Sequence, residues 1–194
     1  MEKSMEKIKI LLLIVSVALC KFVSGQNFEG EIIYSNTFKS KLPNFTDEQL
    51  QLLIGDKQEY FIKEGNYKSL SNGQALTVQL YDDKTNRIYN KTPKSDTLYW
   101  FDASVNTDTV ISFEIKKNVE KILGYECDAI IMKTKTGTTT IYYNAKYKVD
   151  NRPYTKHNYS NWAFYVNQTK ALPLKTVVET NHLKWKVRLL KLSL

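Results

Sequence analysis

YECDAIIMKTKTGTTTIYY, residues 125–143, is the stretch that indicates the fold most directly. Two runs rich in β-branched and aromatic residues flank the turn-forming Lys135-Thr136-Gly137, a pattern that predicts an antiparallel hairpin. In its first run, Cys127, Ala129 and Ile131 alternate with their neighbours. We therefore expect these three side chains to share the face of the strand that packs in the core.

Further hairpins are predicted on both sides of this stretch. Asn72-Gly73 is the strongest turn signal, while Glu64-Gly65-Asn66 and Asn181-His182 each separate two more strand-like runs. Many short strands at such close spacing are typical of an all-β sandwich or barrel. The expected strands outside the first hairpin cover 28–34, 60–62, 67–70, 76–81, 87–90, 98–101, 110–116, 174–180 and 183–192.

Alternation also predicts which side of two strands is buried. Leu76, Val78 and Leu80 alternate with more polar residues, so we expect them to face inward. The last strand has an apolar face that includes Trp185 and Val187. Its opposite face is basic and would either meet lipid headgroups or protect the strand from edge-to-edge aggregation. That basic face consists of Lys184, Lys186 and Arg188.

One helix is predicted after the first strand. The Thr46 hydroxyl and the Gln49 side chain have the spacing of a capping box, and Gly55 is placed to end the helix. Leu50, with Leu53 and Ile54, would face inward. A helix of about two turns is unstable alone in water, so it should lie on the sheet.

Residues 1–25 resemble a secretory signal peptide. A lysine-containing head precedes the apolar run 10–19, and Val23-Ser24-Gly25 suits cleavage. The run is short for a membrane span, so we expect a cleaved, exported protein, periplasmic or extracellular and not transmembrane. The alternative is a lipoprotein anchored through Cys20, although Leu19 occupies a position where a small residue is usual. Residues 26–194 would form a single β-rich domain.

Composition limits the partners of this domain. Residues 26–194 carry 24 basic and 18 acidic residues, a net charge of +6. Such a charge either favours anionic surfaces or keeps the protein dispersed. The basic residues are scattered, so we expect no nucleic-acid partner. Cys127 alone remains after cleavage, which excludes an internal disulfide and favours a bacterial envelope protein.

Catalytic and metal motifs are not recognisable in the sequence. Cys127, His157 and Asn158 are the residue types of a cysteine hydrolase, but the alternation around Cys127 favours a core position. His157 and His182 lack metal-ligand spacing, and Asp82-Asp83 is better explained as a turn. We therefore expect a protein without catalytic residues, metal or other cofactor.

The aromatic segment 151–166 is the most unusual part outside the strands. It would serve either as a wet binding surface or as a plug for one end of the β core. Its aromatic residues are Tyr154, Tyr159, Trp162, Phe164 and Tyr165.

Several motifs resemble those of a family of secreted Bacteroidetes proteins, the GLPGLI-type proteins. They include Lys121–Cys127, Thr138–Tyr143 and Lys170–Leu174, with Phe28–Gly30 and Tyr81–Tyr89 earlier in the chain. Some relatives are similar to the LolA/LolB half-barrels. This resemblance implies a mainly β fold, a strongly curved antiparallel sheet with one or two short covering helices around an apolar cavity.

The resulting hypothesis is a non-enzymatic envelope protein of a Gram-negative bacterium that binds a lipid or other hydrophobic small molecule in a half-barrel cavity. The alternative is a structural or interaction module that contacts another envelope protein through the aromatic segment. The residues expected to contact the ligand are Tyr34, Leu76, Val78, Leu80, Cys127, Ile131, Trp162, Tyr165 and Trp185.

Overall fold

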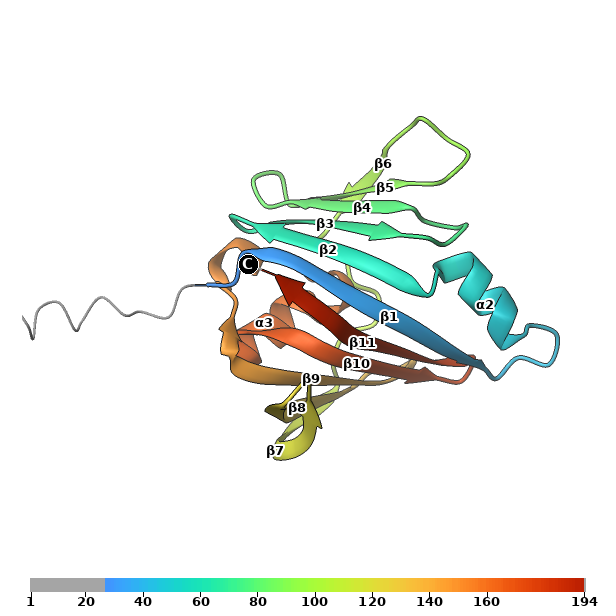
Figure 1. The fold of residues 1–194 in the computed structure, drawn as a ribbon. Coiled ribbons are helices and arrows are strands. Elements are labelled where there is room, and N and C mark those ends of the chain that lie inside the picture. Colours follow the sequence, from blue (N-terminus) through green and yellow to red (C-terminus); the bar gives the residue numbers. More distant parts are fainter. Residues whose placement is uncertain (1–26, 194) are drawn as a thin grey trace, which may run out of the picture.

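One antiparallel sheet of eleven strands organises the protein, whose computed structural model describes residues 27–193 (Figure 1). The predicted signal peptide and Cys20 lie outside the described residues. The strands are β1 (Gly30–Ser40), β2 (Lys57–Lys63), β3 (Asn66–Ser71), β4 (Val78–Asp82), β5 (Arg87–Lys91), β6 (Tyr99–Asp102), β7 (Ser112–Ile122), β8 (Tyr125–Lys133), β9 (Gly137–Lys148), β10 (Ala171–Thr180) and β11 (Leu183–Ser193).

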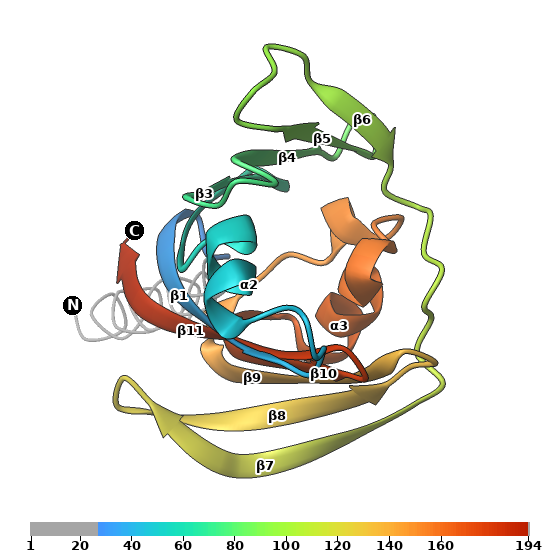
Figure 2. The same cartoon turned by 90° about the vertical axis from the view of Figure 1, so that its right-hand side faces the viewer.

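The order of the strands is β6-β5-β4-β3-β2-β1-β11-β10-β9-β8-β7. Consecutive strands pair as a meander, except at the centre, where β1 pairs with β11. The edge strands β6 and β7 are consecutive in the chain but are not paired with each other; residues 103–111 connect them. Figure 2 shows the sheet bent around the helices. This open, strongly curved sheet with short helices confirms the predicted mainly β class, and it is neither a sandwich nor a closed barrel.

Helix α2 (Asp47–Ile54) begins as its sequence predicts. The Gln49 amide donates to the Thr46 Oγ1 at 3.2 Å, and the Thr46 amide donates to Gln49 Oε1 at 2.8 Å. Both halves of the capping box are therefore confirmed. Leu50 is buried, so the short helix is held by packing next to β1 as well as by its cap.

The end of α2 is fixed by the loop between β3 and β4. Gly55 follows the helix with a φ of 95°, a conformation that side chains rarely tolerate. In the loop, the Ala75 amide donates to the carbonyl of Leu53 at 2.9 Å. A Cβ on Gly73 would lie 2.4 Å from the Ile54 carbonyl oxygen, so only glycine permits this close approach. The loop thus satisfies carbonyl groups that a helix end leaves free.

The buried face of β4 differs from the prediction. Leu80 is 36% exposed and lies on the outer face, whereas Tyr81 is 1% exposed. The Tyr81 ring stacks on Tyr67 at 5.4 Å, and its hydroxyl donates to Asn86 Oδ1 and to the Pro153 carbonyl. A tyrosine whose ring packs and whose hydroxyl is satisfied can take the inner position. The inward orientation predicted for Leu80 is therefore wrong.

Strand β8 also departs in part from the predicted alternation. Cys127 and Ala129 are buried, but Ile131 is only half-buried and Ile130 is fully buried. Ile130 pairs directly with Ile141 of β9, and directly opposed residues of an antiparallel pair share a face. Since Ile130 and Ile131 are both isoleucine, alternation alone could not decide between them.

The aromatic segment packs inside the curve of the sheet. It forms the 3-10 helices η2 (Arg152–Tyr154) and η3 (Tyr159–Asn161), followed by α3 (Trp162–Thr169) (Figure 2). Tyr154 and Tyr165 are 2% and 1% exposed, and both rings lie against Trp162, at 5.8 and 5.5 Å. Of the two predicted roles, these contacts match the plug of the β core.

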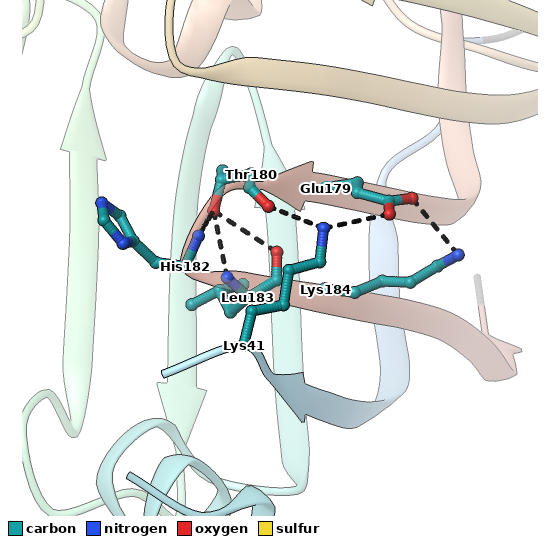
Figure 3. A network of polar contacts seen from close by, with 6 residues as sticks. All are labelled: Lys41, Glu179, Thr180, His182, Leu183 and Lys184. Carbon is teal, nitrogen blue, oxygen red and sulfur yellow. Dashed lines mark hydrogen bonds and ion pairs between the residues drawn. The ribbon is translucent and has the colours of Figure 1, made fainter. Parts of the chain in front are cut away.

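A polar network fastens the β10–β11 hairpin to the end of β1 (Figure 3). Lys41 donates to Glu179 at 3.1 Å and to the Thr180 carbonyl at 2.8 Å, while Lys184 approaches the other oxygen of Glu179 at 3.3 Å. The Thr180 hydroxyl accepts from the amides of His182 and Leu183. This network orders the turn and the strand ends at one end of the sheet.

Candidate ligand-binding cavity

A cavity of about 970 Å³ lies on the concave side of the sheet. Its walls come from β1–β4 on one side and β9–β11 on the other. The end of α2, the 103–111 connection and the segment 157–162 complete it. The curvature of the sheet creates this space, since a flat sheet would hold these residues apart. Its apolar surface exceeds its polar surface.

The lining residues are buried in the deep part of the cavity and exposed at its rim. Deep positions are occupied by side chains that are almost fully buried, and these include Ile32, Tyr34, Ile62, Tyr67, His157 and Leu172. Exposed lining residues mark the rim, and these include Leu53, Ala75, Val105, Thr107, Thr136 and Ser160. The rim residues belong to α2, the β3–β4 loop, the 103–111 connection, the β8–β9 turn and η3. Helix α2 lies at the end of the bent sheet that faces the viewer in Figure 2.

Neighbouring tyrosines form one wall of the cavity. Tyr34 on β1 contacts Tyr60 on β2 edge to face at 6.4 Å, and Tyr60 lies 5.2 Å from Tyr67 on β3. Tyr67 in turn stacks on Tyr81 of β4, which continues the row outside the lining. Tyr67 is directly opposite Tyr81 in the register, and the other two pairs are diagonal neighbours on adjacent strands. The wall therefore presents aromatic surface with few freely rotating bonds.

The hydroxyl groups of this wall stay neutral. Burial raises the pKa of Tyr34, with a further contribution from Tyr60, and burial likewise raises the pKa of Tyr60 and of Tyr67. Burial also raises the pKa of Tyr81 to about 12. Desolvation disfavours the phenolate form in each case. At neutral pH the wall therefore offers aromatic faces and uncharged hydroxyl groups.

His157 lies at the buried end of the cavity. Its Nε2 is 3.0 Å from the Tyr67 hydroxyl, and its ring is 4.3 Å from the ring of Tyr81. Burial lowers the pKa of His157 to about 4, so the imidazole is neutral at pH 7. Its Nδ1 is buried without a protein partner. This histidine can accept or donate a hydrogen bond but carries no charge at neutral pH.

Asp108 holds the rim together. Its carboxylate accepts the hydroxyls of Thr134, at 2.7 Å, and Thr136, and it also accepts the amides of Lys135 and Thr136 at 3.1 and 3.2 Å. Desolvation raises the pKa of Asp108. The hydrogen bonds from Thr136 and Thr134 and from the amides together lower it by more, so the pKa lies below its usual value. The carboxylate therefore stays ionised and ties the 103–111 connection to the β8–β9 turn.

The structure brings five of the nine predicted ligand-binding residues together. The residues that line the cavity are Tyr34, Leu76, Val78, Trp162 and Trp185. Leu80 is exposed on the face of β4 opposite Tyr81, and Ile131 lies on the other face of β8 from the inward Ile130. Cys127 and Tyr165 are buried in the core and do not reach the lining. The lining role predicted for these four residues is wrong.

The residues of the hydrolase hypothesis are not hydrogen-bonded to one another. The Cys127 thiol donates to the Tyr125 carbonyl at 3.3 Å, whereas the His157 Nε2 contacts Tyr67. Burial is the main cause that raises the pKa of Cys127, which disfavours the nucleophilic thiolate. Cys127 thus has the surroundings of a core residue.

Within residues 27–193, no cluster of three or more His, Cys, Asp or Glu side chains is arranged to hold a metal ion. None of the helices described there has the length and apolar character needed to cross a membrane.

Sequence reasoning missed several lining residues. Tyr60 and Ile62 alternate along β2, and Tyr67 and Ser69 alternate along β3, so the period-2 pattern was present. Asp108 lies in a connection without periodicity, and its contacts with residues 134–136 depend on tertiary structure. The residues on β2 and β3 could therefore have been found from the sequence, whereas Asp108 could not.

Comparisons with protein-family models, with curated proteins and with solved structures found no match.

Proposed function

We propose that this protein is a non-enzymatic, exported envelope protein that binds a lipid or other hydrophobic molecule in the cavity. The cavity itself carries the proposal. Its volume of about 970 Å³ lies at the upper end of the range of ligand pockets, and its lining is mainly apolar and aromatic. Export is supported by the signal-like residues 1–25.

Native mass spectrometry tests this proposal. Protein purified from the periplasm should carry a co-purifying hydrophobic molecule that a solvent extract releases. We expect Thr176→Trp to retain less of it, because Thr176 lines the cavity and the larger side chain would occupy part of the space. Val177→Trp is the matched control, since Val177 is the next residue on β10 and does not line the cavity.

Absence of any bound molecule, together with no uptake of hydrophobic probes by the folded protein, would contradict the proposal. Equal binding by Thr176→Trp and wild type would show that the ligand does not contact the cavity wall at Thr176.

The alternative, an interaction module, depended on exposed aromatics in 151–166. Tyr154 and Tyr165 are buried there, and Trp162 is partly buried against both. The cavity therefore supports ligand binding as the proposed function over an interaction module.

A further inference from the structure

The cavity is large and mainly apolar, and no lysine or arginine of the described residues lines it. Building on the ligand-binding function proposed above, we propose that the cavity selects an uncharged amphiphile, with a hydroxyl, ester or amide polar group, over an anionic lipid or free fatty acid.

The described basic residues lie outside the cavity lining. The chain contains 28 lysine and arginine residues, yet among the described residues none of them lines the cavity. Strand β11 shows how they are separated. Trp185 and Val187 line the cavity. Lys184, which precedes Trp185, and Lys186, which lies between the two, are exposed. A carboxylate or phosphate moved into this cavity would lose water without gaining a cationic partner, which is strongly unfavourable.

Few ionisable groups line the cavity. Apart from tyrosines, these are Asp108 at the rim and His157 at the buried end. Asp108 is anionic and already accepts four hydrogen bonds, so it would repel an anionic headgroup. His157 is neutral at pH 7 because burial lowers its pKa to about 4. Neither residue offers a positive charge.

The lining supplies neutral donors and acceptors. Uncharged hydroxyl and amide side chains occur among the lining residues, and these include Gln58, Ser71, Thr107, Thr136, Thr138 and Ser160. A neutral polar group can pair with such residues without the desolvation penalty of an ion.

These observations also orient the ligand. The deep wall of aliphatic and aromatic side chains fits the apolar part, and the hydroxyl-rich rim fits the polar part. Both parts are accommodated without charge.

A matched ligand series tests the selectivity. Delipidated protein is titrated at pH 8 with 1-dodecanol, methyl dodecanoate and dodecanoate, which share a chain but differ in charge. We expect the alcohol and the ester to bind at least tenfold more tightly than the ionised acid. Dodecanoate binding equal to or tighter than the alcohol would overturn the inference and leave the proposed ligand-binding function standing. Failure of all three ligands to bind would instead remove the proposed function and this inference with it.

A charge-introducing variant provides the second measurement. Thr176→Lys places a cation on the cavity wall and should shift the preference toward dodecanoate by at least tenfold relative to wild type. Val177→Lys, one position along β10 and outside the lining, should leave the preference unchanged. Gln58→Lys repeats the test on β2 if Thr176→Lys fails to fold, as judged by its circular dichroism spectrum. An unchanged ligand preference in a folded cavity variant would contradict charge as the basis of selection.

Discussion

The Tyr67 hydroxyl and the His157 Nε2 lie 3.0 Å apart at the buried end of the cavity, joining two residues that are 90 positions apart in the chain. This contact fixes the segment between η2 and η3 against β3. It also places a titratable group where its charged form is poorly solvated.

The first prediction is that acid destabilises the protein through His157. Its pKa is about 4 when folded and near 6.5 when unfolded, so the unfolded state binds the proton first as pH falls. Stability present above pH 6.5 is lost between about pH 6.5 and pH 4, by about 3 kcal/mol. Urea unfolding at pH 7 and pH 4 measures this loss. We expect His157→Gln to lose about 3 kcal/mol less than wild type over the same interval, and an identical loss would contradict the prediction.

The second prediction concerns the start of α2. Thr46→Ala removes the acceptor of the Gln49 amide and should lower the free energy of unfolding by about 1 kcal/mol. Gln49→Ala should have a smaller effect, because it removes only the reciprocal bond to the Thr46 amide. Urea midpoints of both variants check this, and midpoints equal to wild type would mean that the cap adds nothing to stability.

The third prediction is that Asp108 orders the cavity rim. Asp108→Ala removes the acceptor of four hydrogen bonds from residues 134–136 and should cost about 2 kcal/mol of stability. The amides of Lys135 and Thr136 should exchange with deuterium faster than in wild type. Asp96→Asn is the control. The Asp96 side chain is fully exposed, and its ion pair with Lys91 is long, at 3.8 Å. Unchanged exchange at residues 135 and 136 would show that these bonds do not protect the turn.

The fourth prediction is that Cys127 is unreactive in the folded protein. It is fully buried, and burial raises the pKa of its thiol, so little accessible thiolate exists. With Cys20→Ser, the chain keeps Cys127 as its one thiol. A chromogenic disulfide reagent should then react only after urea unfolding. Rapid stoichiometric labelling at pH 8 without denaturant would reopen the case for a catalytic cysteine.

Local features of the fold were predictable because nearby residues determine them. The Thr46–Gln49 capping box depends on side chains a few positions apart, and it is present. Asn72-Gly73 does begin the connection between β3 and β4, but this connection is the loop 72–77 packed against the end of α2 and not a tight turn. The choice between Leu80 and Tyr81 was not predictable, because either side chain can be buried. The tertiary contacts of Tyr81 with Tyr67 and Pro153 decide it.

The cavity was predictable only in part for a similar reason. Tyr34 and Trp185 are on strands with clear alternation, and they line it. The positions of His157 and Asp108 depend on how far the sheet bends and on how the 103–111 connection crosses it. Periodicity contains no information on curvature, so these two residues came from the structure alone.

The central pairing of β1 with β11 has a consequence for the synthesis of the protein. Ser35 pairs with Arg188, which follows it by 153 residues. While the ribosome is still making the chain, β2–β6 can assemble as a local meander, but the strand pairing that joins the two halves of the sheet cannot form until residues 183–193 emerge. Contacts this distant in sequence are slow to form. The nascent chain therefore stays incompletely folded until its translation has reached the last described strand.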